Sequence, residues 1–72
     1  MKKIKKIKIK LNGKVKVITK DNKISNLLTD AKISLNKVAI ELNNEILDKK
    51  KINKIKLKND DKVEIVHFIG GG

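Results

Sequence analysis

The chain has 72 residues, enough for one domain with a small core, because a short chain leaves much of its surface in water. Its net charge is +11, and all nineteen basic residues are Lys. It contains no Cys, which excludes disulfides, a thiolate nucleophile and a Cys-ligated metal.

These features predict a cytoplasmic protein. The absence of Cys fits a reducing compartment. Residues 1–6 are basic like the start of a signal peptide, but the apolar stretch of about 7–15 residues that defines one does not follow. No apolar run approaches the roughly 20 residues of a membrane span.

The excess of Lys has three interpretations. Lys, Ile and Asn have A/T-rich codons and fill more than half of the chain, so a base-composition bias would explain the charge as a plain solvated surface. Alternatively, the positive charge would bind an acidic protein partner. Nucleic-acid binding is disfavoured, because the chain has no Arg for bidentate contacts and a single aromatic residue, Phe68, for stacking.

Residues 6–19 predict an antiparallel β-hairpin. Residues 6–11 alternate strictly, with Ile7, Ile9 and Leu11 on one face and Lys on the other. Asn12-Gly13 is the strongest two-residue hairpin signal, because a type I′ turn needs positive φ at both positions. Residues 14–19 resume the alternation, and we expect Val15 and Val17 to point inward.

A helix is predicted over about residues 23–32, where the apolar period changes. Ile24, Leu27, Leu28 and Ala31 form one helical stripe that would pack on the sheet. Either Asp21 or Asn22 can cap the first turn by accepting a bond from a free backbone N–H. No glycine marks the end of the helix.

The second half of the chain predicts three more strands. Residues 38–42 form one, residues 45–47 a short one after an Asn43-Asn44 turn, and residues 62–68 the last, with Val63 and Ile65 inward. Residues 48–58 are a Lys-rich loop with a short helical turn or edge strand, and residues 59–61 are a turn.

The element order predicts an α+β fold, a mixed sheet of four to five strands with one helix packed across it. The first and last strands are expected to be parallel neighbours at the centre. Residues 1–68 then form a single domain, and residues 69–72 are a flexible C-terminal tail that leaves from a central strand. Glycine has no Cβ, so Gly70, Gly71 and Gly72 form a thin tail that can enter a narrow site on another protein.

Four stretches carry a family resemblance: Lys-Leu-Asn-Gly-Lys (10–14), Val-Ala-Ile-Glu-Leu-Asn-Asn-Glu-Ile-Leu (38–47), Asp-Asp-Lys-Val-Glu-Ile-Val-His-Phe (60–68) and Ile-Gly-Gly-Gly (69–72). With them the chain resembles the ubiquitin-like β-grasp fold and, more closely, the ThiS family of sulfur carriers in thiamine (thiazole) biosynthesis. Asn44 and Asp60 replace turn glycines of that family, and both residue types tolerate positive φ. Asp48-Lys49 replaces its usual Pro-Arg, so no role of that Arg is carried over.

The resemblance implies a protein co-substrate rather than an enzyme. An E1-like adenylating enzyme (ThiF-type) would adenylate the Gly72 carboxylate with ATP, and a sulfur donor such as a cysteine desulfurase system would convert it to a thiocarboxylate. That group would donate sulfur to a thiazole synthase (ThiG-type). The carrier itself would bind no cofactor and supply no catalytic side chain.

Val66, Phe68 and Ile69 are the candidate docking residues beside the tail. Val66 and Phe68 alternate with Val63 and Ile65, so they are expected on the open face of the sheet. Exposed apolar residues that lead to the tail favour partner docking. The alternative is that the hairpin covers them or that they are simply tolerated.

No catalytic or metal-binding constellation is predicted. His67 is the only His and is interpreted as a strand residue beside the tail. Asp60-Asp61 is interpreted as a turn, because two carboxylates supply too few oxygens for a good Mg²⁺ or Ca²⁺ site.

Three rival functions remain open. One is the small subunit of molybdopterin synthase, another sulfur carrier that ends in Gly-Gly. A second is a ubiquitin-like modifier that is conjugated to lysines. The third, from a different class, is a small basic nucleic-acid-binding module, which would explain the charge but leave the tail unused.

Overall fold

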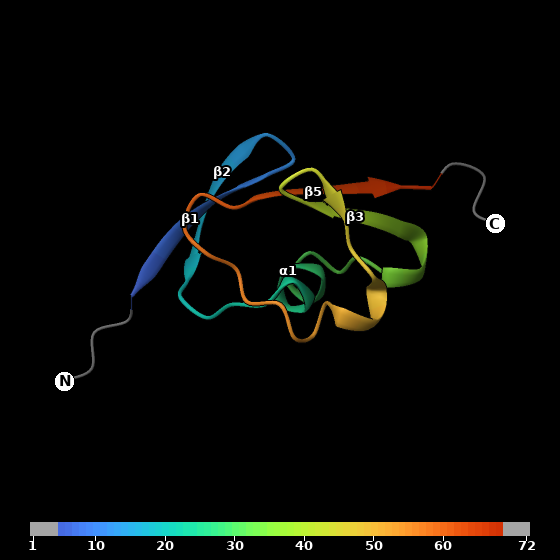
Figure 1. Cartoon of the computed structure of the whole chain (residues 1–72), viewed down its shortest axis with the longest axis horizontal. Helices are drawn as coiled ribbons and strands as arrows, with labels where there is room; N and C mark the ends of the chain where they lie inside the picture. The colour runs from blue at the N-terminus through green and yellow to red at the C-terminus, as the bar shows by residue number, and fades with distance from the viewer. Residues whose placement is uncertain (1–4, 69–72) are drawn as a thin grey trace.

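A five-stranded mixed sheet with one helix across it forms the body of the protein (Figure 1). The computed structural model describes residues 5–68. The strands lie in the order β2-β1-β5-β3-β4; β1 and β5 are parallel and the other neighbours antiparallel. The elements in chain order are β1 (Lys6–Leu11), β2 (Lys14–Thr19), α1 (Ile24–Asp30), the short 3-10 helix η1 (Leu35–Lys37), β3 (Val38–Leu42), β4 (Glu45–Ile46), the 3-10 helix η2 (Lys49–Lys51) and β5 (Lys62–His67). The α+β prediction and the parallel central pair are confirmed.

The hairpin of β1 and β2 is confirmed, but the predicted direction of two valines is wrong. Asn12 and Gly13 both have positive φ, 51° and 82°, as the tight turn requires. A two-residue turn pairs Leu11 with Lys14, so Val15 lies opposite Lys10 and shares its face. Val15 and Val17 are therefore 66% and 52% exposed.

The pairing of β2 with β1 is regular, so Lys14, Lys16 and Ile18 share one face of the sheet. Ile18, opposite Ile7 in the register, is the residue of β2 that enters the core.

Helix α1 is shorter than predicted, and Lys23 is its N-cap residue in place of Asp21 or Asn22. The Lys23 backbone N–H donates to Asn26 Oδ1 at 2.9 Å, while Asp21 sits in a turn with φ 70°. Ile24, Leu27 and Leu28 are buried as predicted, but Ala31 at the C-cap is exposed.

The end of α1 uses a left-handed Lys32 where glycine is usual. Lys32 has φ 57°, and the Ile33 N–H donates to the Leu28 carbonyl at 2.9 Å while the Lys32 N–H donates to the Thr29 carbonyl. These two bonds form a Schellman motif. The helix thus ends without the residue by which such an end is recognised in a sequence.

One apolar core lies between the sheet and α1. Ile24, Val38 and Val63 have no measurable exposure. The loop between β4 and β5 also contributes, since Ile52 and Leu57 are buried in the same cluster. The remaining buried members are Ile9, Ile18, Leu27, Leu28, Ile40 and Ile65.

Asparagine side chains extend the hydrogen bonding of the sheet around β5. The Asn12 N–H donates to the Val63 carbonyl at 2.9 Å, and Asn12 Oδ1 accepts from the Ile65 N–H at 2.8 Å. Asn43 Oδ1 likewise accepts from the Lys62 N–H at 2.9 Å. The tip of the β1–β2 turn is therefore fixed to the central strand by both its backbone and its side chain.

Asn12→Ala is expected to lower the free energy of unfolding by about 2–5 kcal/mol. The change leaves the Ile65 N–H without its acceptor, at about 1–3 kcal/mol, and forces Ala into the left-handed region, at about 1–2 kcal/mol. Urea unfolding followed by circular dichroism measures it.

Two control variants separate these effects. Asn12→Gly keeps the turn geometry and loses only the acceptor, so it should fall between wild type and Asn12→Ala. Asn12→Asp keeps an acceptor and should stay nearest to wild type. Wild-type stability of Asn12→Gly would show that the bond to Ile65 contributes nothing.

Candidate functional site

The site that the sequence predicts lies at the C-terminal end of β5. This strand lies between β1 and β3 and runs toward the C-terminus (Figure 1). Beyond its last residue, the Phe68 N–H still donates to the Lys37 carbonyl at 2.9 Å, so the backbone is held as far as Phe68. Ile69 and the glycines Gly70, Gly71 and Gly72 lie outside the described residues.

Val66 and Phe68 are both half-exposed, at 51% and 50%, so the hairpin does not cover them. Val66 pairs with Ala39 and lies on the face of the sheet opposite the buried Val63 and Ile65. The predicted exposure is confirmed, while the docking role of Val66, Phe68 and Ile69 stays a prediction.

The Phe68 ring has one cationic neighbour. Lys49 Nζ lies 5.1 Å from the ring centroid, within the range of a cation–π interaction. Lys49 belongs to η2 and stands where the family resemblance leads one to expect Arg. The apolar end of β5 is thus flanked by a positive charge from a segment distant in sequence.

The open face of the sheet, the face away from α1, combines lysines with exposed apolar side chains. By register, β1 contributes Lys6, Lys8 and Lys10 to it, opposite Thr19, Val17 and Val15 of β2. The other half holds Lys62, Glu64, Val66, Ala39, Glu41 and Ile46. Val15, Val17 and the 77% exposed Ile46 were not predicted here. The two-residue turn was the signal that could have placed the valines, because it fixes which residues face each other.

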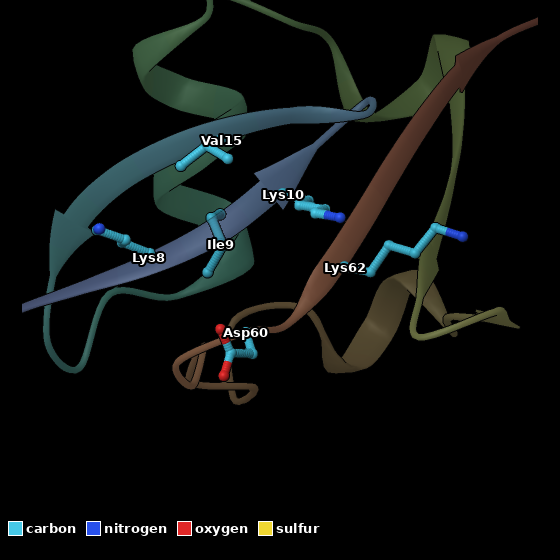
Figure 2. Close-up of a pocket in the computed structure, with 6 residues that line it drawn as sticks. All are labelled: Lys8, Ile9, Lys10, Val15, Asp60 and Lys62. Atoms are coloured by element: carbon cyan, nitrogen blue, oxygen red, sulfur yellow. The ribbon is translucent and has the colours of Figure 1, made fainter.

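A hollow of about 390 Å³ opens where β1 and β5 diverge (Figure 2). Lys8, Lys10, Val15, Asp60 and Lys62 line it together with Ile9. Figure 2 shows the Lys8 and Lys62 ammonium groups directed to opposite sides, and Lys62 Nζ is paired with Glu64 at 3.4 Å. The charges therefore do not converge on one point, as a small anion site would require.

The remaining polar candidates have structural roles. Asp60 occupies the turn before β5 with φ 72°, and the Asp61 carboxylate accepts from the Lys58 N–H and from Asn43 Nδ2. His67 is exposed and pairs with Val38 in the β3–β5 ladder. Within residues 5–68, no three His, Asp or Glu side chains gather as metal ligands would.

Asn44, the other position where the family usually has a turn glycine, also has φ 72°, so both turns form as predicted. Among residues 5–68, no helix is long and apolar enough to cross a membrane.

Comparison with known proteins identifies the fold and then the family. The crystal structure of the thiamine biosynthesis protein ThiS from Geobacter metallireducens superposes with a TM-score of 0.78 at 29% identity, over 92% of this chain and all of that one. Its solution structure gives a TM-score of 0.70. The fold is the ubiquitin-like β-grasp that the sequence predicts.

The ThiS family model matches residues 9–72. The sulfur carrier protein ThiS of Bacillus subtilis is 38% identical over 65 residues, which cover 89% of this chain and 98% of that protein. A thiazole synthase of Magnetococcus marinus is 35% identical over 66 residues, which make up only 20% of that enzyme. The chain belongs to the ThiS family, and the predicted membership is confirmed.

Two valines on β5 provide a matched test of which face is open. Val63→Thr should lower the free energy of unfolding by about 1–3 kcal/mol, because it places a hydroxyl in the core. Val66→Thr should change it by less than about 0.5 kcal/mol, because the residue is half in water. Thermal or urea unfolding measures both, and equal losses would contradict the assignment of Val66 to the open face.

Proposed function

We propose that this protein is a sulfur carrier of thiamine biosynthesis that holds sulfur as a thiocarboxylate on Gly72. The observation that carries the proposal is the family match, which extends through the terminal glycines to residue 72. The Bacillus subtilis relative, named a sulfur carrier, matches over nearly its whole length.

The arrangement of β5 supports a role for the tail as a presented substrate. Residues up to Phe68 are held by the sheet and by the bond to Lys37, and three glycines follow Ile69. Glycines have no side chains to obstruct a narrow channel. A partner can therefore bind the folded body and receive the terminal carboxylate, which is four residues beyond Phe68 in the sequence.

The proposed chemistry needs an activated carboxylate. An oxygen of the Gly72 carboxylate attacks the α-phosphorus of ATP, pyrophosphate leaves, and an acyl adenylate forms. The terminal sulfur of a persulfide then attacks the acyl carbon and displaces AMP, which gives an acyl disulfide. A thiol attacks the donor's sulfur in that disulfide, so that a thiocarboxylate is released and the donor and the thiol remain as a disulfide.

Other proteins supply every catalytic group in this scheme. An E1-like adenylating enzyme of the ThiF type would bind ATP, and a cysteine desulfurase system would form the persulfide. The carrier would contribute its tail and a docking surface, bind no cofactor and act in the cytoplasm. It would be a co-substrate, not an enzyme.

Thiazole synthase is the proposed acceptor of the sulfur. A fifth of the Magnetococcus marinus thiazole synthase resembles this chain, so that enzyme includes a segment similar to the carrier. In that enzyme the carrier-like segment and the rest of the thiazole synthase are parts of one chain. Joining two partners in one chain raises their effective concentration for each other. It supports thiazole synthase as the enzyme that this carrier meets and favours thiamine synthesis over molybdopterin synthesis.

Intact mass spectrometry tests the proposal. After incubation with the adenylating enzyme, ATP and a persulfide donor, the chain should gain the mass difference between sulfur and oxygen. The variant that lacks Gly72 should show no gain, because its terminus is one residue short of the adenylation site. A gain in that variant, or none in wild type with an active enzyme, would refute the proposal.

Phe68→Ala tests docking beside the tail. We expect the affinity for the adenylating enzyme to fall by more than about 1 kcal/mol, as for a partly exposed aromatic anchor. Isothermal titration calorimetry measures the affinity, and urea unfolding of the same variant provides the control. A loss of stability as large as the loss of binding would instead make Phe68 a core residue.

A further inference from the structure

The hairpin half of the open face has a pattern that the tail chemistry does not require. We define the hairpin face as Lys6, Lys8, Lys10, Val15 and Val17. In the β1–β2 register, Lys8 lies opposite Val17 and Lys10 opposite Val15, so cationic and apolar side chains alternate across the strands. Both valines are more than half exposed, although a solvated strand would normally carry polar residues there.

The lysines of this surface have no acidic partner within the described part of the chain. The one ion pair found among residues 5–68 joins Lys62 to Glu64, on the neighbouring strand β5. Asp60 lines the hollow beside Lys8 and Lys10 but forms no ion pair with them. The hairpin face therefore presents positive charge that its own surroundings do not neutralise.

We propose that the hairpin face is a second docking surface for the adenylating enzyme, and that it fits an acidic surface with apolar side chains between its carboxylates. The choice of this partner rests on the function proposed above. The lysines of the hairpin face would pair with carboxylates of the partner, and Val15 and Val17 would contact its apolar side chains. The hollow between β1 and β5 leaves room for a side chain that projects from the partner.

A nucleic acid fits this surface less well. Phosphates would be neutralised by Lys6, Lys8 and Lys10, but they offer nothing to the two exposed valines. No aromatic side chain lies on the hairpin face for base stacking, since Phe68 is the only aromatic residue of the chain. A protein surface with carboxylates and apolar side chains would contact both the lysines and the valines.

The hairpin face lies far from the C-terminal end of β5. Lys10 pairs with Lys62 in the parallel ladder, and Lys62 is five residues before His67, the last residue of β5. Lys6 is four residues before Lys10 along β1. At about 3.3 Å per residue the surface extends to roughly 30 Å from the end of β5. An enzyme that contacts both regions would hold the carrier at two separate points, which fixes its orientation while the tail reacts.

Charge-reversal variants test the proposal with a matched control. The hairpin variant is Lys6→Glu/Lys8→Glu/Lys10→Glu. The control is Lys32→Glu/Lys54→Glu/Lys56→Glu, which changes exposed lysines just after α1 and in the loop that contributes Ile52 to the core beneath the sheet. Figure 1 shows this loop beside α1, on the covered side of the sheet. Each variant lowers the net charge of +11 by six, so only the position of the charge differs.

The association rate with the purified adenylating enzyme, measured by stopped flow, is the main readout. For wild type we expect it to fall at least about tenfold between about 0.05 M and 0.5 M salt. At low salt the hairpin variant should associate at least about tenfold more slowly than wild type, and the control less than about threefold. Val15→Thr/Val17→Thr should dissociate severalfold faster with little change in association. Urea unfolding verifies that each variant folds.

Two results would overturn the proposal. Equal slowing in the hairpin and control variants, or in neither, would show that the hairpin face is not a docking surface. Salt-dependent binding of a short DNA duplex that is lost in the hairpin variant and kept in the control would assign the surface to nucleic acid.

The mass-gain assay distinguishes failure of the docking surface from failure of the function. Normal sulfur loading of wild type, together with unchanged association of the hairpin variant, would refute the docking surface alone. No loading of wild type would refute the sulfur-carrier function and, with it, the choice of this partner.

Discussion

The parallel pairing of β1 with β5 is the contact on which the rest of the structure depends. It joins the first strand of the chain to the last, and β3 pairs on the other side of β5. The ladder covers only two residue pairs, and Asn12 extends it through its bonds with Val63 and Ile65. This closure buries Val63 and Ile65 in the core with α1 and leaves the alternate residues of β5 on the open face.

Local patterns predicted most of this fold, because alternation, the Asn-Gly turn and the helical stripe each reflect the conformation of a few residues. They failed where a contact distant in sequence decided the outcome. Ile52 and Leu57 of a Lys-rich loop complete the core in this way. The helix ends differ for a local reason, because Lys23 and Lys32 occupy cap positions that other residue types usually hold. The wrong direction of Val15 and Val17 is different, since the register of a two-residue turn already determines it.

The candidate site also has features that the sequence predicted and features that it did not. The sequence predicted the exposure of Val66 and Phe68, because a period of two along one strand is enough for that. It could not predict Lys49 over the Phe68 ring, since that contact needs the tertiary arrangement. The pairing of Lys with Val across the hairpin could have been predicted from the turn register. Together these features describe a folded body with an apolar region at the end of β5 and a basic, partly apolar surface on the hairpin. Under the proposed function, partner enzymes supply the chemistry and the open face supplies recognition.

The most direct test of the account asks which residue carries the sulfur. Trypsin cleaves after Lys62, and the next ten residues contain no Lys or Arg, so residues 63–72 are released as one peptide. After loading with the adenylating enzyme, ATP and a persulfide donor, tandem mass spectrometry of this peptide should place the sulfur-for-oxygen exchange on Gly72. An exchange that is absent from this peptide, or sulfur bound at any other residue, would contradict the assignment of this protein as a carrier that works through its C-terminal carboxylate.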